Sequence, residues 1–148
     1  MELSEKREIL AESPLFDNLL PPELTMLAEL FSLREFAEGE PVFAQGDVGN
    51  TLYVIADGVA EIVSDGVSIA ELSAPQFFGE MSLIDKEYRS ATVKAKKALK
   101  ILELTNENLH IFAKHYRNGF TWVVVNIARV LSTRLREVNK RLAEAKSA

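Results

Sequence analysis

The chain has 148 residues, of which 47% are apolar and 26% charged, with a formal net charge of −5 and no cysteine. A chain of this length buries roughly two-thirds of its unfolded surface, which suits one domain with a substantial core. The lack of cysteine excludes a disulfide scaffold, a thiolate metal site and a cysteine nucleophile. The acidic balance argues against general affinity for nucleic acid.

The sequence has neither a membrane span nor a signal peptide that we can identify. The longest apolar stretch, Trp122 to Leu131, is interrupted by Asn126 and Arg129 and is about half as long as a bilayer requires. The first residues, Met-Glu-Leu-Ser-Glu-Lys-Arg-Glu, lack the basic-then-apolar order of a signal peptide. We therefore expect a soluble cytoplasmic protein with a single domain over residues 1–148.

Helices are expected at the N-terminal end of the chain. Leu3–Ala11 is the first of them. Pro21-Pro22 begins a second helix that runs to about Leu30, because proline is tolerated in a first turn.

A region rich in turn-forming residues follows. Six of the seven glycines lie between residues 39 and 79, and regular turn formers separated by short apolar runs are typical of antiparallel strands. Asp57-Gly58 and Asp65-Gly66 predict hairpins because glycine reaches positive φ without a steric cost. The expected strands are Phe31–Phe36, Pro41–Gln45, Thr51–Ala56, Val59–Ser64, Val67–Leu72, Ala91–Lys96 and Leu99–Leu104.

Two helices are expected at the C-terminal end. Asn106 can cap a helix that ends at about His115, and Asn118-Gly119 is expected to break the chain before a long helix from Phe120 to Ala145. The predicted fold class is therefore α+β. An antiparallel β-roll or jelly roll over residues 31–104 is flanked by N-terminal helices in residues 3–30 and C-terminal helices in residues 106–145.

The segment with the clearest chemistry is residues 78–92, Phe-Gly-Glu-Met-Ser-Leu-Ile-Asp-Lys-Glu-Tyr-Arg-Ser-Ala-Thr. Gly79 precedes about one possible helical turn, whose first N–H groups would form an anion site. Arg89 offers a planar fork that matches two phosphate oxygens. A carboxylate beside an anion site needs a donor of its own, such as a sugar hydroxyl. Glu80 and Arg89 together therefore suggest a phosphorylated ribose, and the alternative is a helix-start carboxylate paired with a surface arginine.

The run Phe-Gly-Glu-x-Ser-Leu-Ile-x-x-x-x-Arg-Ser-Ala-Thr-Val resembles the phosphate-binding cassette of the cyclic-nucleotide-binding domain family. That family includes catabolite-activator-type regulators, kinase regulatory subunits and cyclic-nucleotide-gated channels. The resemblance extends to the hairpin glycines Gly39, Gly46 and Gly58 and to the helix pair after the cassette. It implies a sensor domain that binds cAMP, with cGMP as the less favoured ligand.

The resemblance also implies roles for individual residues. Glu80 corresponds to the glutamate that accepts a hydrogen bond from the ribose 2′-hydroxyl, and Arg89 to the arginine that pairs with the exocyclic phosphate oxygens. Gly79, Met81 and Ser82 lie where backbone amides surround the ribose and phosphate.

Further contacts to the phosphate or the purine are implied after the arginine and on the last helix. Ser90 and Ala91 follow the arginine, and Ser90 leaves the choice of base open. Arg134 can lie flat on the base or remain a solvated helix arginine, with Leu135 and Val138 as apolar alternatives. The implied ligand-binding residues are Phe78, Gly79, Glu80, Met81, Ser82, Arg89, Ser90, Ala91, Arg134 and Leu135.

The sequence departs from the family pattern at two places. Pro75-Gln76-Phe77 stands where a proline-glycine pair is usual, and Tyr88 stands where a proline is common. Neither departure removes a ligand contact, but each can change the affinity.

The long helix carries an apolar stripe with steps of three and four residues. In the resembling regulators this helix pairs with its twin, so we expect a homodimer; the alternative is a monomer whose helix covers the roll. The six residues after Leu142 leave no room for a helix-turn-helix, so no DNA binding is expected. The stripe comprises Val124, Ile127, Leu131, Leu135, Val138 and Leu142.

Other activities find little support in the sequence. A cupin-like metalloenzyme needs histidines on strands, whereas His110 and His115 fall on the helical side and are expected at or near the surface. Phe120 and Trp122 are expected to pack the helix on the core. No phosphate loop, nucleophile elbow or dinucleotide fingerprint is present, so we expect no enzyme activity, no catalytic residue and no metal site.

Two functional classes remain open. The first is a cyclic nucleotide sensor whose ligand moves the C-terminal helix. The second is a degenerate module that acts as a dimerisation or adaptor domain, with an unknown protein partner. A sensory fragment of a larger channel, kinase or transporter is a third possibility, against which the short acidic N-terminus argues mildly.

Overall fold

The computed structural model describes residues 1–80 and 88–147. Its helices are α1 (Leu3–Glu12), the 3-10 turn η1 (Pro14–Phe16), α2 (Pro21–Leu30), α4 (Asn106–His115) and α5 (Arg117–Ser147). Its strands are β1 (Ser32–Phe36), β2 (Pro41–Phe43), β3 (Thr51–Asp57), β4 (Val59–Ser64), β5 (Val67–Ser73), β6 (Phe77–Phe78), β7 (Thr92–Ala95) and β8 (Leu99–Thr105).

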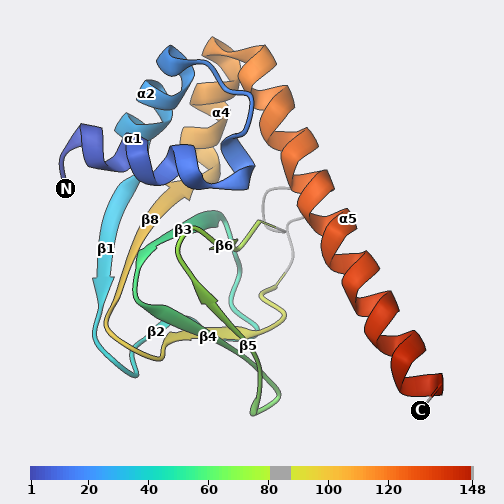
Figure 1. Ribbon diagram of the computed structural model, residues 1–148. Helices are drawn as coiled ribbons and strands as arrows, with labels where there is room; N and C mark the ends of the chain where they lie inside the picture. Colours follow the sequence, from blue (N-terminus) through green and yellow to red (C-terminus); the bar gives the residue numbers. More distant parts are fainter. Residues whose placement is uncertain (81–87, 148) are drawn as a thin grey trace.

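The strands form two antiparallel sheets of four strands each. Their orders are β1-β8-β3-β6 and β2-β7-β4-β5, so most neighbours within a sheet are distant in sequence, as in a roll. The predicted hairpin at Asp65-Gly66 joins β4 to β5, with φ of 50° and 79° at its two residues. The predicted hairpin at Asp57-Gly58 is wrong, because the strands on either side of it, β3 and β4, belong to different sheets. The prediction of an antiparallel β-roll flanked by helices is confirmed (Figure 1).

Three strands, β3, β6 and β8, contribute buried residues to both hydrophobic cores of the molecule. Side chains of a strand alternate between its faces, and in β3 the residues Tyr53 and Ile55 join the core inside the roll, whereas Leu52 and Val54 join the core under the helices. Strand β8 divides its side chains in the same way. The nearly continuous apolar run in β3 follows from this burial on both faces.

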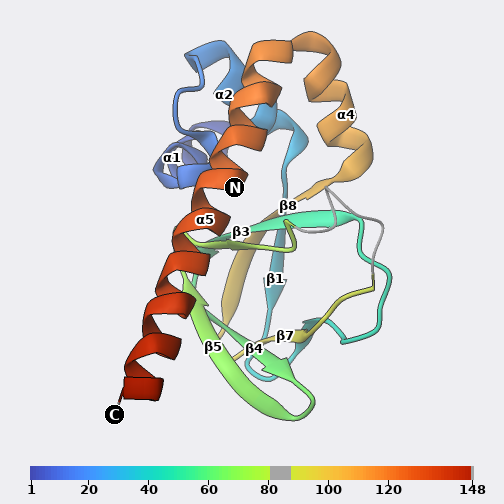
Figure 2. The same ribbon diagram turned by 90° about the vertical axis from the view of Figure 1, so that its right-hand side faces the viewer.

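The helices gather at one end of the roll, and α5 runs from there down one side (Figures 1 and 2). The first half of α5 is fixed to the N-terminal region through Asn126, which is buried. Its Nδ2 group donates hydrogen bonds to the carbonyl oxygens of Leu15 at 3.0 Å and Asp17 at 2.8 Å. Within residues 1–80 and 88–147, no helix has the length and apolar character that a membrane span requires.

Several local predictions are corrected. Helix α5 begins at Arg117 rather than Phe120, so Asn118-Gly119 does not break the chain there. Gly119 is buried against the Glu23 side chain, and tertiary packing holds it inside the helix. The cap of α4 is Thr105, whose hydroxyl accepts a hydrogen bond from the Asn108 N–H group, rather than Asn106.

The sequence analysis did not predict η1 or β6. Each is very short: η1 has three residues and β6 has two. The β6 residues Phe77 and Phe78 pair with Val54 and Tyr53 of β3, so β6 is defined by a distant partner rather than by a local pattern.

Candidate functional site

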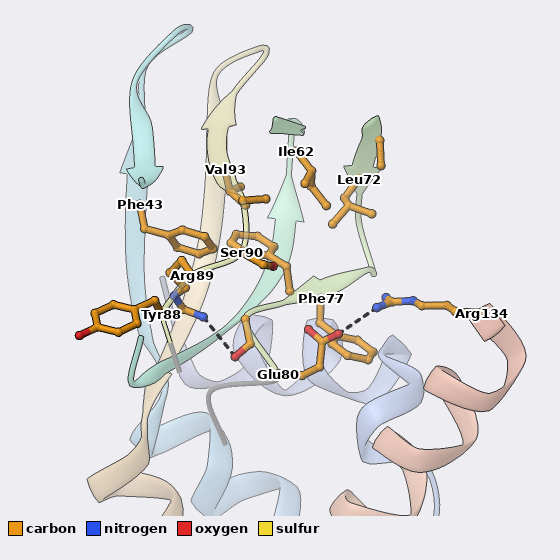
Figure 3. Close-up of a pocket in the computed structure, with 14 residues that line it drawn as sticks. Phe43, Ile62, Leu72, Phe77, Glu80, Tyr88, Arg89, Ser90, Val93 and Arg134 are labelled. Carbon is orange, nitrogen blue, oxygen red and sulfur yellow. Dashed lines mark hydrogen bonds and ion pairs between the residues drawn. The ribbon is translucent and has the colours of Figure 1, made fainter. Parts of the chain in front are cut away.

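A cavity of about 570 Å³ lies between the β2-β7-β4-β5 sheet and α5 (Figure 3). Strands β4, β5 and β7 supply an apolar wall, and the residues after β6, before β7 and on α5 supply the charged groups. Its lining residues are Phe43, Ile62, Ala70, Leu72, Phe77, Phe78, Gly79, Glu80, Tyr88, Arg89, Ser90, Ala91, Val93 and Arg134.

Arg89 is buried, with 9% of its surface exposed. Its Nη2 group donates to the Thr51 carbonyl oxygen at 2.9 Å, and its Nη1 group donates to the Gly79 carbonyl oxygen at 3.4 Å. The guanidinium carbon lies 4.2 Å from the centre of the Phe43 ring. Two carbonyl dipoles and an aromatic face therefore hold the cation, and all three attract positive charge.

The charge on Arg89 has no ion-pair partner in the part of the chain that the structure describes. Within residues 1–80 and 88–147, no carboxylate oxygen lies within 4.0 Å of its guanidinium nitrogens. Burial lowers the pKa of Arg89, while Tyr53 and Glu80 act in the opposite direction. A buried cation without a counter-ion is costly, so the geometry of the described residues favours an anionic ligand.

The backbone at Gly79 is shaped for the turn that enters the site. Its φ is +82°, and a Cβ atom there would lie 2.7 Å from the Thr51 carbonyl oxygen. A side chain would therefore meet both a conformational cost and a backbone clash. Glycine at this position allows β6 to turn directly into the segment that carries Glu80.

Glu80 is also buried, with 7% of its surface exposed. Its Oε1 atom accepts a hydrogen bond from Arg134 Nη1 at 3.0 Å. The guanidinium carbon of Arg134 lies 5.1 Å from the centre of the Phe77 ring. Arg134 thus connects α5 to the roll through the carboxylate that the sequence assigned to the ribose.

The remaining wall of the cavity is largely apolar. Ile62 of β4 and Val93 of β7 are directly paired across the sheet, and Leu72 of β5 lies beside them (Figure 3). The Ser90 side chain lies toward the same cavity and adds a hydroxyl group. Such a wall suits the flat face of a heterocyclic base and leaves few polar contacts to its edge.

The structure brings most of the predicted site residues to one cavity. Leu135 is not among the lining residues and is 61% exposed. Met81 and Ser82 lie outside the described residues. The predicted residues that line the cavity are Phe78, Gly79, Glu80, Arg89, Ser90, Ala91 and Arg134.

Several lining residues were not singled out from the sequence. Ile62, Leu72 and Val93 belong to predicted strands, and the alternation of side chains in those strands could have placed them on the inner face. Phe43 carried no such signal because β2 has only three residues. No group of three or more potential metal ligands is found among residues 1–80 and 88–147.

Comparison with known proteins identifies the family to which this chain belongs. Residues 33–116 match the cyclic nucleotide-binding domain family. The chain is 33% identical over 135 residues to the cyclic AMP receptor protein of Thermus thermophilus, which covers 88% of this chain and 61% of that protein. It is 36% identical over 94 residues to the cAMP-dependent protein kinase regulatory subunit of Schizosaccharomyces pombe, covering 63% of this chain and 23% of that protein.

Solved structures agree with the sequence relatives. The catabolite activator protein of Thermus thermophilus superposes with a TM-score of 0.76 at 33% identity, covering 88% of this chain and 62% of that one. A cyclic nucleotide-binding domain from Methylobacillus flagellatus superposes with a TM-score of 0.83 at 24% identity, covering 95% and 82% of the two chains, and shows the same fold. The chain thus spans less than two-thirds of the length of the two curated relatives described above. It belongs to the cyclic nucleotide-binding domain family.

Proposed function

We propose that the chain is a regulatory domain that binds cAMP and transmits binding to its C-terminal helix. The observation that carries the proposal is the buried Arg89, which faces a cavity without a carboxylate partner among the described residues. A cyclic phosphate would supply the missing negative charge, and Glu80 would accept a hydrogen bond from the ribose 2′-hydroxyl. The proposed role is binding and regulation rather than catalysis.

The choice of cAMP rests on the apolar wall and on the relatives. Ile62, Leu72 and Val93 offer a base no polar side-chain atoms, and two of the relatives described above are named for cAMP. The Ser90 hydroxyl can also accept a hydrogen bond from the amino group of guanine, and a cGMP-dependent protein kinase of Toxoplasma gondii is 32% identical over 94 residues. We therefore propose cAMP as the preferred ligand and cGMP as a weaker one.

The Arg134–Glu80 pair suggests how binding reaches α5. A ribose hydroxyl that donates to Glu80 approaches the carboxylate that Arg134 already contacts, so the ligand and the helix meet at the same group. A ligand moves α5 only by the difference in its affinity for the two helix positions. We propose that Arg134 reorients toward the ligand and that α5 follows.

A dimer through α5 and a cytoplasmic location complete the proposal. The outer half of α5 exposes Leu135, Val138 and Leu142, which one roll does not cover. With a net charge of −5, we propose that this domain contacts neither DNA nor lipid directly and that its output passes through a protein partner.

Calorimetry of the full chain with cAMP and cGMP tests the proposal. We expect saturable binding, tighter for cAMP, and loss of binding in Arg89→Gln. Arg34→Gln is the matched control, because Arg34 also lies over a phenylalanine ring, at 5.0 Å from Phe36, but is far more exposed than Arg89. At about 100 times the dissociation constant, the ligand should stabilise the fold by about 2.7 kcal/mol. The absence of heat at near-millimolar ligand would contradict the proposal.

A second reading, a dimerising module without a ligand, is favoured by one observation. The Glu80 carboxylate already has a partner in Arg134. If the Arg134–Glu80 ion pair never opens, no cyclic nucleotide will change the melting temperature of the protein. The protein will nevertheless be a dimer. The same titrations therefore separate the two functions.

A further inference from the structure

Arg89 keeps its position in the absence of a carboxylate partner among the described residues, so other groups must hold it. Its main chain is attached to the loop between β2 and β3. The Arg89 N–H group donates to the Asp47 carbonyl oxygen at 2.6 Å, and the Gly46 N–H group donates to the Arg89 carbonyl oxygen at 2.8 Å. The same loop and the strand before it also contact the side chain.

Phe43, at the end of β2, provides a fixed surface for the guanidinium. The guanidinium carbon lies 4.2 Å from the centre of its ring. The ring is itself packed against Tyr53 and Phe78, at 5.8 and 5.9 Å between centroids, and those two rings stack on each other at 4.9 Å. These ring contacts restrict the movement of Phe43, which lies beside Arg89 (Figure 3).

Gly49 provides the space that the side chain needs. Its φ lies outside the left-handed region, so a side chain at this position would not meet the backbone strain of that region. A Cβ atom at this position would nevertheless lie 2.5 Å from Cζ and 2.9 Å from Cδ of Arg89. The three nearest atoms to such a Cβ atom all belong to the Arg89 side chain, so a larger residue would displace that side chain rather than clash with the loop backbone.

We propose that Phe43 and Gly49 are positioning residues that together form a slot for the Arg89 guanidinium and hold it ready for the ligand phosphate. The inference rests on the proposed function, since it assigns the slot to the phosphate of a cyclic nucleotide. An arginine that is already ordered loses less conformational entropy when the phosphate arrives. Loss of one wall of the slot should therefore weaken binding about three- to tenfold.

The test on Phe43 compares leucine, which keeps an apolar side chain without an aromatic face, with tyrosine, which keeps the face. We expect Phe43→Leu to raise the dissociation constant for cAMP about three- to tenfold and Phe43→Tyr to restore most of the affinity. Phe36→Leu is the matched control. Phe36 belongs to the core against which Phe43 packs, and an arginine also lies over its ring. Unlike Phe43, however, Phe36 does not line the cavity.

The test on Gly49 separates positioning from stability. We expect Gly49→Ala to raise the dissociation constant about tenfold or more, because Arg89 must leave the slot, while the melting temperature stays close to that of the wild type. In addition, the Nε–H signal of Arg89 in a nitrogen-proton NMR spectrum, assigned by its loss in Arg89→Lys, should shift or broaden in Gly49→Ala and in Phe43→Leu. This readout needs no ligand.

The outcomes distinguish this inference from the proposed function. If the wild type binds cAMP but both variants keep its affinity and the Arg89 signal, the slot is wrong and the sensor function stands. If the wild type binds no cyclic nucleotide while the variants still disturb the Arg89 signal, the proposed function is wrong, and the slot remains supported as the element that holds Arg89.

Discussion

Arg89 is a residue at which binding and stability oppose each other. Its charge is buried, and its guanidinium donates hydrogen bonds to two neutral carbonyl groups. Desolvation of a charge costs free energy that such contacts offset only in part. We therefore predict that Arg89→Gln, which removes the charge, raises the free energy of unfolding of the unliganded protein by about 1 kcal/mol while cAMP binding is lost.

Urea denaturation without ligand measures this effect, with Arg34→Gln as the exposed control. A clear loss of stability in Arg89→Gln would mean that the two carbonyl bonds and the Phe43 contact outweigh the cost of burying the charge. In that case the buried charge of Arg89 would not favour the binding of an anion.

Tyr53, which lies beside Arg89 in the core inside the roll, gives a prediction on pH. Burial raises the pKa of Tyr53 above its usual value of 10.0, and the nearby Arg89 opposes that change. Above pH 10 the unfolded chain loses this proton while the folded chain retains it, so stability falls as pH rises. We predict that Tyr53→Phe weakens this alkaline loss of stability.

Tyrosinate absorbance checks the assignment directly, because the chain has only three tyrosines. Tyr53 should titrate above its usual pKa of 10.0, and Arg89→Gln should move its titration to still higher pH because the cation is gone. A titration of Tyr53 at or below its usual pKa would contradict its burial.

Whether a site residue could be predicted from the sequence depends on how far it lies from its partners along the chain. Glu80 and Arg89 lie nine positions apart in one segment, so a local pattern was enough to bring them together. Arg134 and Phe43 lie far away in sequence, and no spacing rule connects either of them to that segment. Their contacts with Glu80 and Arg89 arise from the packing of α5 and β2, which only the folded chain defines.

At the level of elements, Asn126 connects α5 to the turn η1. It is 2% exposed, and its amide donates to the Leu15 and Asp17 carbonyl oxygens. Asn126→Ala would remove both hydrogen bonds and leave the two carbonyl oxygens without this donor. We therefore predict that the free energy of unfolding falls by about 2–4 kcal/mol. Asn139→Ala, on the same helix but exposed, is the matched control in denaturant unfolding and should change stability by less than about 0.5 kcal/mol.

The start of α5 shows why a local rule failed. Asn118-Gly119 is a turn signal, yet Gly119 lies inside the helix and is buried. A Cβ atom at Gly119 would lie 2.9 Å from the Glu23 carboxyl carbon and 3.0 Å from Cζ of Phe112. The glycine is therefore required by its contacts with two neighbouring helices, α2 and α4, and not by a turn. A sequence pattern cannot distinguish these two reasons.

The tight packing around Gly119 leads us to expect that a change from glycine to alanine lowers the stability of the protein, whereas in most helices it raises it. In an open helix, Gly→Ala stabilises by roughly 0.5–1 kcal/mol. Here we predict that Gly119→Ala destabilises by about 1–3 kcal/mol because the added methyl group overpacks the contact with Glu23 and Phe112. Thermal unfolding measures the difference. An increase in the melting temperature would show that Glu23 gives way and that the tight contact is unimportant.

At the level of the whole molecule, the fold was predictable because the residues that build its two cores follow regular patterns in the sequence. Turn-forming residues marked most of the strand ends, and the stripe on the last helix predicted an amphipathic element. The stripe alone could not tell which of its residues the roll covers. In the structure Ile127 is buried, whereas Val124, Leu135 and Val138 are exposed, so one stripe serves two surfaces.

The exposed part of that stripe gives the last prediction, on the assembly of the molecule. Leu142 is 53% exposed on the outer half of α5 and would be buried in the dimer that we propose. A glutamate there would carry two charges into the apolar seam, one from each protomer, so we predict that Leu142→Glu weakens dimerisation at least about a hundredfold. Sedimentation equilibrium measures this constant.

The neighbouring variant Ala143→Glu makes the same change in charge one position away from the stripe and should leave dimerisation nearly unchanged. Because Leu142 contributes to neither core of the described fold, both variants should unfold with the cooperativity of the wild type. Equal association constants for the two variants would place the contact surface elsewhere on the molecule. Helix α5 would then act within one chain, connected to the roll by Arg134 and to the N-terminal turn by Asn126.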